Sequence, residues 1–358
     1  MSSTLAAIDD AELAALVARG RTGRGIGGTH AVLEVAGSLV FAKAVPVSEP
    51  ELLVRETRST ANLFGLPPTC QYNVGSPGFN VWRELATHER TTAWVLDGDE
   101  VAFPLLYHWR LLPGSSYEVQ PEHADVAAVV ASFGGDGSVE RRLAAVAASR
   151  WSLLLFLEHV PWNLEDWLGR ELCGDAAAVD GAVELVGQRL LPAVRSMNER
   201  GVFHFDSHLR NVLTDGSDVR ISDFGLATSP TFDLSAAERA FLDAHLLHDP
   251  AYTISRVVNH LVTALSGVVD PTAPDYAARN AYIRRCAAGE EPAALPASAA
   301  AFVGRFAPLV VVMNDFSWEL FADGPPPPFP VDEVAAAAGA VGLLDDLSTV
   351  RRNGSEGA

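Results

Sequence analysis

Three polar side chains stand at short intervals near the middle of the chain. Asp206 is followed by Asn211 five residues later and by Asp223 seventeen residues later. The residues between Asn211 and Asp223 form two β-prone runs joined by turn-forming residues at 215–218, which predicts a hairpin. In such an arrangement one carboxylate could accept a hydrogen bond from a reacting hydroxyl. The carboxamide and the second carboxylate could hold a divalent cation.

Phosphoryl transfer from Mg-ATP requires this set of groups. His204, Asp206 and Asn211 match the pattern H-x-D-x-x-x-x-N, and residues 223–225 read D-F-G. On these residues the chain resembles the protein kinase-like superfamily, which includes eukaryotic-type protein kinases and aminoglycoside phosphotransferase-like enzymes. The resemblance implies that Asp206 orients the acceptor hydroxyl and that Asn211 and Asp223 bind Mg²⁺. For D-F-G alone, a polar hairpin with a capping aspartate is the structural alternative.

Length and charge limit the class of protein. The 358 residues suffice for two lobes with a substantial core, and 48% apolar against 20% charged residues indicate an ordered globular chain. A net charge of −19 argues against nucleic acid or an anionic membrane as the main partner. It is compatible with a cationic substrate, although solubility alone is the commoner reason for an acidic surface.

The cysteines and the N-terminus indicate a cytoplasmic protein. Cys70, Cys173 and Cys286 are far apart and odd in number, which predicts reduced thiols and no zinc site. No basic region or long apolar core follows Met1, so no signal peptide is expected. The apolar run 306–313 is too short to span a bilayer. We therefore expect a soluble protein without a membrane partner.

Three glycines near the N-terminus, Gly23, Gly25 and Gly28, satisfy the pattern G-x-G-x-x-G. A dinucleotide-binding fold would place a helix after them, whereas the runs 31–35 and 38–45 that follow are β-prone. A flexible loop is the alternative for the glycines alone. The strand that follows favours a hairpin whose backbone N–H groups approach the phosphates of ATP.

Lys43 lies in the second β-prone run, fifteen residues after the last of these glycines, and matches the family's V-A-I-K lysine. The resemblance implies that Lys43 contacts the α- and β-phosphates of ATP and pairs with a helix glutamate. A lysine on the solvent face is the alternative for an arbitrary strand. A helix is predicted over 49–64. Glu56 is the favoured partner because Glu51 follows Pro50 at the helix start, too close to Lys43 along the chain.

The next part of the chain is expected to complete the sheet. Three runs are β-prone: 79–85, 91–96 and 100–112. Helices are predicted at 122–133 and 138–149. Typical protein kinases have a much shorter connection at this place, so the two helices are interpreted as an insertion near 115–150, of unknown purpose.

An apolar strand at 153–157 leads into Glu158 and Val160, and a polar helix start follows at 163–168. This segment resembles the family's linker between lobes. The resemblance implies that backbone groups of Glu158 and Val160 bind adenine, and a buried strand leaving a sheet is a compatible structural interpretation. Apolar residues at helical spacing predict a helix over 178–199 that delivers the chain to the H-x-D motif.

About 25 residues separate Asp223 from Asp249, and no A-P-E sequence lies between them. In the family an Asp before the next apolar helix, here 253–265, ties down the loop around the residue matching Asp206. Asp249 is expected to do this or to act as an ordinary N-cap. Two further helices are predicted: 298–314 and 331–346.

These predictions combine into an α+β, bilobal protein kinase-like fold. An N-lobe at 1–157 would hold an antiparallel five-stranded β-sheet, the glycine-rich hairpin and the helical insertion. A mostly helical C-lobe at 158–350 would hold the motifs at 204–225, and residues 351–358 are expected to be disordered.

We therefore expect a kinase that moves the γ-phosphate of ATP to a hydroxyl, with ATP and Mg²⁺ as cofactors. A small-molecule acceptor such as an antibiotic or metabolite is favoured by two residues and by the short segment after D-F-G. Phe205 replaces the Arg that reads a phosphorylated activation loop. His208, a further catalytic candidate, stands where aminoglycoside-type enzymes carry His and serine/threonine kinases carry Lys.

Other interpretations stay open at this point. D-F-G itself is more typical of protein kinases, and Arg210, four residues after Asp206, resembles the residue of tyrosine kinases. A serine/threonine protein kinase is the first alternative. A pseudokinase binding module would require a missing catalytic group, and none is missing. If the acceptor is cationic, four acids after D-F-G are the nearest candidates to hold it: Asp233, Glu238, Asp243 and Asp249.

Overall fold

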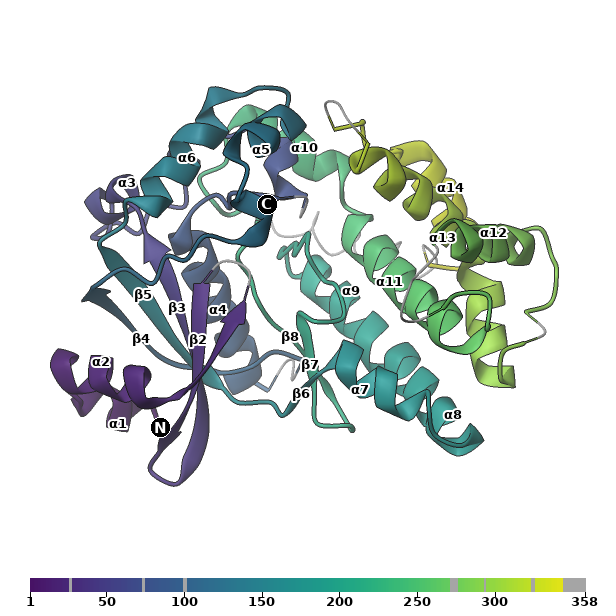
Figure 1. Cartoon of the computed structure of the whole chain (residues 1–358), viewed down its shortest axis with the longest axis horizontal. Helices are drawn as coiled ribbons and strands as arrows, with labels where there is room; N and C mark the ends of the chain where they lie inside the picture. The colour runs from purple at the N-terminus through teal and green to yellow at the C-terminus, as the bar shows by residue number, and fades with distance from the viewer. Residues whose placement is uncertain are drawn as a thin grey trace.

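The computed structural model has a mixed α+β fold, with an antiparallel sheet on one side and a helical region on the other (Figure 1). It describes residues 1–25, 28–72, 75–98, 102–270, 276–292, 294–322 and 326–343. The predicted disordered tail and residues 26–27, at the tip of the glycine-rich hairpin, lie outside the described residues.

The main sheet confirms the predicted antiparallel arrangement. Its five strands follow the order β1-β2-β3-β5-β4. Their bounds are β1 Arg21–Gly25, β2 Gly28–Val35, β3 Ser38–Val47, β4 Leu106–Pro113 and β5 Trp151–Glu158. Strands β2 and β3 are joined at Ala36 and Gly37, whose φ angles of 50° and 78° are the left-handed geometry of a tight hairpin. β3 lies in the middle of the sheet, so a side chain on it is flanked by strands on both sides.

Different helices cover the two faces of this sheet. One face packs on α1 (Ser2–Ala7) and α2 (Asp10–Arg19), whose side chains Leu5 and Leu13 are fully buried there. The other face packs on α4 (Val81–Leu96). Successive side chains of a strand point to opposite faces. Alternate residues of β3 therefore face α4, and Lys43 is one of them.

Helix α4 corrects the predicted strands at 79–85 and 91–96. Asn80 caps the helix, because its side chain accepts a hydrogen bond from the N–H of Trp82 at 3.0 Å. The β-branched and aromatic residues in this stretch favour strands locally. Packing of a helix face on the sheet outweighs that preference. The predicted helix 49–64 is also wrong beyond its start, because α3 covers only Glu49–Leu53 and turns follow it.

The two helices of the predicted insertion are confirmed. α5 (Val126–Ser132) and α6 (Gly137–Ala147) lie between β4 and β5 in the sequence. In space they pack on the segment that precedes α4, around the buried side chains Phe79, Val129 and Leu143. The insertion therefore adds a small apolar cluster next to the start of α4.

The helical region contains most of the remaining elements. They are α7 Leu164–Glu171, α8 Ala176–Leu185, η3 Val186–Leu190, α9 Leu191–Glu199, α10 Ala236–Ala244, α11 His248–Leu265, α12 Tyr276–Ala287, α13 Ala297–Leu320 and α14 Val331–Ala340. Two short helices, η1 Pro68–Gln71 and η2 Pro121–His123, precede α4 and α5 in the chain. The predicted helix 178–199 is the continuous run from α8 to α9. The helices predicted at 253–265, 298–314 and 331–346 correspond to α11, α13 and α14. A small sheet of β6 (Trp162–Asn163), β7 (Val212–Thr214) and β8 (Val219–Ile221) contains the predicted hairpin.

Helix α13 is long and apolar enough to cross a membrane by length and composition. Its side chains Phe306, Val310 and Met313 are nevertheless buried in the largest apolar cluster, with residues of α11 and α12. A core helix of a soluble protein has this character, so the structure is compatible with a soluble chain. All three cysteines, each in the described part of the chain, are free thiols.

Candidate active site

Lys43 of β3 joins two carboxylates from distant parts of the chain. Its Nζ atom donates to Glu84 Oε1 and to Asp223 Oδ1, each at 2.7 Å. Glu84 lies in the first turn of α4, and Asp223 lies two residues after the end of β8. The buried ammonium group therefore links the sheet, the helix that covers it and the predicted metal-binding residue.

The expected pair between Lys43 and Glu56 is not formed. The side chain of Glu56 is 85% exposed and pairs with its neighbour Arg55. The reason is that α3 ends at Leu53, so the helix that packs against Lys43 is α4 and its first acid takes the position. The asparagine cap before Glu84, followed by apolar residues at helical spacing, is the sequence signal that could have identified α4.

The charges of this cluster influence one another. Burial alone would lower the pKa of Lys43, but Asp223 and Glu84 raise it above its ordinary value. Burial raises the pKa of Glu84. Burial also favours a higher pKa for Asp223, but the Lys43 ammonium outweighs burial there and keeps the pKa of Asp223 below its usual value. Asp223 is therefore the carboxylate that stays ionised at the lower pH.

Glu51 has a role that sequence reasoning missed. Its Oε1 atom accepts from the N–H of Val81 and its backbone O accepts from Trp82 Nε1, both at 2.9 Å. Its Oε2 atom accepts from Arg142 Nη1 of α6, also at 2.9 Å. Glu51 and Arg142 are both buried. The insertion is therefore fastened, through one buried ion pair, to the end of α4 that presents Glu84 to Lys43.

Asp206 and Asn211 are held together by hydrogen bonds. The Asn211 Nδ2 atom donates to the Asp206 carbonyl at 2.9 Å and to its Oδ2 atom at 3.0 Å. His208 Nε2 lies 3.7 Å from Asp206 Oδ1. Burial, and to a lesser degree neighbouring positive charge, lowers the pKa of His208 to about 4, so this imidazole is neutral near pH 7. The structure thus brings His208 beside the carboxylate.

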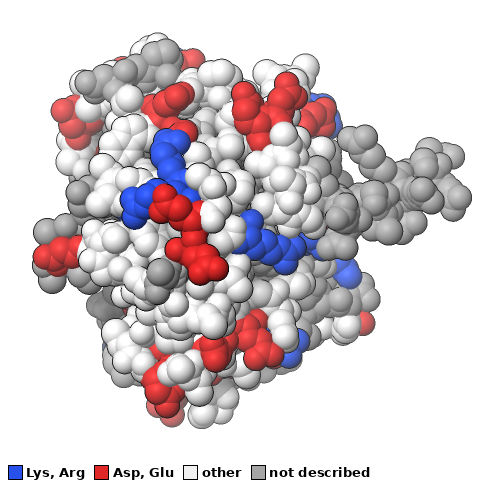
Figure 2. Space-filling view, turned by 90° about the vertical axis from the view of Figure 1, so that its right-hand side faces the viewer, with Lys and Arg blue, Asp and Glu red and all other residues white. Residues whose placement is uncertain are grey.

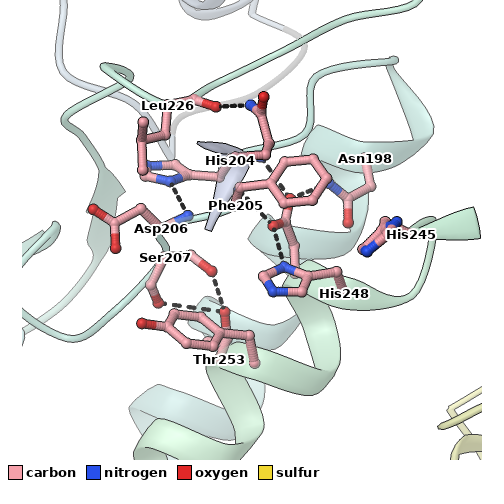
Figure 3. A network of polar contacts seen from close by, with 12 residues as sticks. Asn198, His204, Phe205, Asp206, Ser207, Leu226, His245, His248 and Thr253 are labelled. Carbon is pink, nitrogen blue, oxygen red and sulfur yellow. Dashed lines mark hydrogen bonds and ion pairs between the residues drawn. The ribbon is translucent and has the colours of Figure 1, made fainter. Parts of the chain in front are cut away.

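The imidazole of His204 connects this loop to the residue before Asp223. Its Nδ1 atom accepts from the N–H of Asp206 at 3.2 Å (Figure 3). Its Nε2 atom lies 2.9 Å from the Ser222 carbonyl. These two partners require the neutral tautomer with the proton on Nε2. Burial lowers the pKa of His204, in agreement with a neutral ring.

Asp249, in the first turn of α11, ties down the loop, as expected. Its carboxylate accepts from the N–H of His204 at 2.6 Å, from the N–H of Phe205 at 2.7 Å and from Asn198 Nδ2 at 2.8 Å (Figure 3). Phe205 has a φ of 62°, which is unusual for a bulky residue. The two backbone bonds to Asp249 hold it in that conformation.

The proposed metal ligands stand next to each other. Ser222 donates to the Asn211 carbonyl from its N–H at 2.8 Å and from its hydroxyl at 2.9 Å, which sets Asp223 beside Asn211. Among the described residues, no group of three or more His, Cys, Asp or Glu could hold a metal alone. One carboxylate with one carboxamide suits Mg²⁺, which takes its remaining ligands from water and phosphate. The residues present therefore fit that ion.

The glycine-rich hairpin is antiparallel, as predicted. Gly23 and Gly25 lie in β1, and Gly25 pairs with Gly28 at the start of β2. Two positions beyond Gly28, His30 lies opposite Lys43 across the β2–β3 pair. The glycines therefore lie on β1 and β2, and β2 is next to β3, which carries Lys43. Residues 26–27 lie outside the described residues.

The predicted adenine-binding segment begins at the end of β5. The N–H of Glu158 donates to the Leu105 carbonyl at 2.8 Å, and its carboxylate accepts from the N–H of Leu105 at 3.2 Å. Val160 follows in the half-buried stretch between β5 and β6. The backbone of this segment connects the main sheet to the helical region, so the segment lies where the two parts of the molecule meet.

Three of the four acids expected to hold a cationic acceptor have other contacts. Glu238 forms a buried ion pair with Arg83 at 2.7 Å. Asp233 accepts from the hydroxyl of Ser59 and the N–H of Thr60 at 3.0 and 3.2 Å. Asp249 is the loop anchor described above. The acidic side chains visible in Figure 2 lie in several separate groups rather than in one patch.

No protein-family model matches the chain, and no curated protein matches it in sequence. The site is therefore interpreted from its own residues.

Proposed function

We propose that the chain is a Mg-ATP-dependent phosphotransferase with a bilobal protein kinase-like fold. The observation that carries the proposal is the contact of Lys43 with both Glu84 and Asp223, next to the loop that holds Asp206. An ammonium, a metal-binding carboxylate and a hydroxyl-orienting carboxylate are the groups that this reaction needs. The main sheet would be the N-lobe and the helical region the C-lobe, with the link after β5 between them.

Each residue has a distinct task in this proposal. Lys43 binds the α- and β-phosphates, and Asn211 with Asp223 holds Mg²⁺, which neutralises charge on the phosphates when it is bound. Asp206 accepts a hydrogen bond from the acceptor hydroxyl and aligns it with the γ-phosphate. Neutral His208 is a possible donor beside Asp206. Glycine backbone N–H groups of the β1–β2 hairpin face the phosphates, and backbone groups near Val160 bind adenine.

A small-molecule acceptor is supported by the segment after Asp223. Buried Arg83 of α4 pairs with Glu238, and Arg90 of α4 donates to Ser229 and Thr231 at 2.8 and 2.6 Å. The short segment is thus bonded to α4 along its length, and less of it is left to dock a peptide. The alternative acceptor is a protein hydroxyl, as for a serine/threonine protein kinase. A panel of small-molecule and protein acceptors separates the two.

The test measures ADP formation from Mg-ATP over polyhydroxylated amines, nucleoside antibiotics, hydroxy acids and unfolded casein. We expect a metal-dependent transfer to one class of small molecule, and Asp223→Asn should abolish it by removing a metal ligand while ATP still binds weakly. Turnover of Asp223→Asn at the wild-type rate would contradict the metal assignment. Efficient transfer to casein with no transfer to any small molecule would favour the protein kinase.

A further inference from the structure

Helix α11 places an arginine on the side of the helical region that carries Asp206. The hydroxyls of Thr253 and Ser207 are hydrogen-bonded at 2.7 Å, which fixes α11 under the loop (Figure 3). Arg256 follows Thr253 by one helical turn, so it lies on the same face. Arg256 also lines the same small cavity as Phe205, the residue before Asp206. The Arg256 charge also contributes to the lowered pKa of His208, whose Nε2 atom lies 3.7 Å from Asp206 Oδ1, so the guanidinium group lies on the side of α11 that faces the loop.

The Arg256 guanidinium group is only partly satisfied. Its Nη2 atom donates to Tyr252 Oη at 3.0 Å, and its central carbon lies 4.6 Å from the centroid of the Tyr252 ring. Its Nε atom is buried and has no hydrogen-bond partner, and in the described chain no carboxylate forms an ion pair with it. A buried donor without an acceptor costs free energy. Arg256 therefore has capacity left for an external anion.

A second arginine approaches from α12. Arg279 donates to Asn280 Oδ1 from Nη2 and Nε at 3.3 and 3.4 Å. Asn314 donates to the same oxygen at 3.1 Å and forms two hydrogen bonds, of 2.8 and 2.9 Å, with Asn259. Asn259 lies one turn after Arg256 on α11. These asparagines thus hold α12 so that Arg279 lies near Arg256, and burial together with the Arg256 charge lowers the pKa of Arg279 to about 10.

Two acids near the Asp206 loop are already engaged. Glu165 accepts from Arg210 at 3.0 Å, and Asp206 is bound by Asn211. Neither Arg256 nor Arg279 has an ion-pair partner within the part of the chain that the structure describes. Two neighbouring guanidinium groups repel each other unless an anion lies between them. The chain has a net charge of −19, so an uncompensated positive pair beside the loop needs an explanation other than overall composition.

We infer that Arg256 and Arg279 bind an anionic group of the phosphate acceptor, so that the substrate is a hydroxy compound bearing a carboxylate or a phosphate. The inference rests on the proposed function for the transfer itself. A guanidinium fork matches both anions through paired hydrogen bonds. The pair would offset the negative charge that such a substrate brings toward Asp206 and the γ-phosphate. It replaces the expectation of a cationic acceptor.

The experiment compares four compounds that each carry a primary hydroxyl: glycerate, glycerol 3-phosphate, glycerol and ethanolamine. Affinities are measured by calorimetry for the enzyme saturated with Mg²⁺ and a non-hydrolysable ATP analogue, and transfer rates are measured with ATP. At least one anion should bind roughly 10- to 100-fold more tightly than glycerol, the effect of one charged hydrogen bond. Ethanolamine should bind least. The comparison of glycerate with glycerol 3-phosphate identifies which anion the site accepts.

Three variants assign the effect to the arginine pair. Arg279→Gln should raise the KM for the preferred anion about tenfold without raising that for glycerol, since one charged bond is lost. Arg256→Lys keeps the charge but loses the fork, and should have a smaller effect of the same kind. Arg285→Gln is the matched control on α12, because Arg285 pairs with Glu290 at 3.2 Å and points to a different partner. It should behave as wild type.

The outcomes separate the two proposals. Equal affinity for glycerol and both anions, or a preference for ethanolamine, overturns the proposal of an anionic acceptor. If the protein binds Mg-ATP in that case, the phosphotransferase proposal still stands. An anion preference that survives Arg279→Gln and Arg256→Lys overturns the assignment to these residues. Failure of the wild-type protein to bind Mg-ATP overturns both proposals.

Discussion

The site is held by two supports of different construction. On the helical side, Asp249 accepts hydrogen bonds from two backbone N–H groups of the Asp206 loop. On the sheet side, the position of Glu84 depends on side chains, because Arg142 of the insertion holds Glu51 and Glu51 holds the start of α4. The first support fixes a backbone directly. The second acts through successive buried side-chain contacts, so single substitutions should weaken it partially instead of abolishing it.

This difference matters for chemistry as well as for stability. The helical support carries Asp206, which would act on the acceptor, and Asn211, which would act on the metal. The sheet support positions Glu84, which binds Lys43, and Lys43 would act on the nucleotide. Damage to the first should therefore appear mainly in kcat, and damage to the second mainly in the KM for ATP.

Of the changes that compare the two supports, Asp206→Asn should have the largest effect. The variant keeps the shape of the side chain and loses its charge, so kcat should fall by about 10²–10⁴, the range for a positioned acid–base group. The affinity for ATP should barely change, because Lys43, Asn211 and Asp223 are untouched. Steady-state kinetics with ATP and the preferred acceptor measures both quantities. A large change in the KM for ATP with kcat intact would contradict the division of tasks between the two supports.

Asp249→Ala should be the most destabilising change on the helical side. It leaves the N–H groups of His204 and Phe205 buried without an acceptor and releases the left-handed conformation of Phe205. We expect the free energy of unfolding to fall by about 3–5 kcal/mol, because each buried donor left without an acceptor costs about 1–3 kcal/mol. Denaturant unfolding measures this. Asp243→Ala, an exposed residue of α10, is the control and should unfold like the wild type.

Arg142→Met tests the sheet-side support. The side chain is replaced by an apolar one of similar length, and Glu51 loses its ion-pair partner. The free energy of unfolding should fall by about 3–5 kcal/mol, because a buried carboxylate is left without its ion-pair partner. The KM for ATP should rise by up to about tenfold as α4 shifts relative to Lys43. Arg141→Met alters the exposed neighbour on α6 and is the matched control. An unchanged KM for ATP, with stability reduced, would show that the insertion supports the fold but not the site.

The sequence predicted the helical support and missed the sheet support for a physical reason. Asp206 and Asn211 are five residues apart, and the hairpin to Asp223 follows from local turn chemistry, so spacing alone fixes that part of the site. The Asp249 anchor is longer in range, but the resemblance to a known motif supplied it. The confirmed main sheet likewise follows from alternation and hairpin turns within neighbouring segments.

The partner of Lys43 could not be read in the same way. It depends on which helix packs on the sheet, and Glu84 lies 41 residues along the chain from Lys43. The β-branched and aromatic residues around Glu84 favoured a strand locally, and only tertiary packing makes them a helix. The contact between Glu51 and Arg142 spans 91 residues and obeys no short-range pattern. Arg256 and Arg279 come together through α11 and α12, whose packing the sequence does not specify either.

The smallest expected effect is on the pH dependence of stability, and it concerns one of two buried histidines that flank Phe224. His204 is bonded through both ring nitrogens, whereas neither nitrogen of His88 has a hydrogen-bond partner among the described residues. Burial, helped by the Lys43 charge, lowers the pKa of His88 from 6.5 to about 3. Between those values the unfolded chain binds one proton more than the folded one, so stability falls as pH falls, by at most about 1.4 kcal/mol per pH unit.

His88→Leu should leave stability near pH 7.5 within about 1 kcal/mol of wild type, because no hydrogen bond is lost. Its unfolding free energy should depend less steeply on pH between 6 and 4.5, and subtraction from wild type removes the opposite contribution of Glu84, whose pKa is raised. Equal slopes for the two proteins would mean that His88 is already charged or bonded in the folded chain.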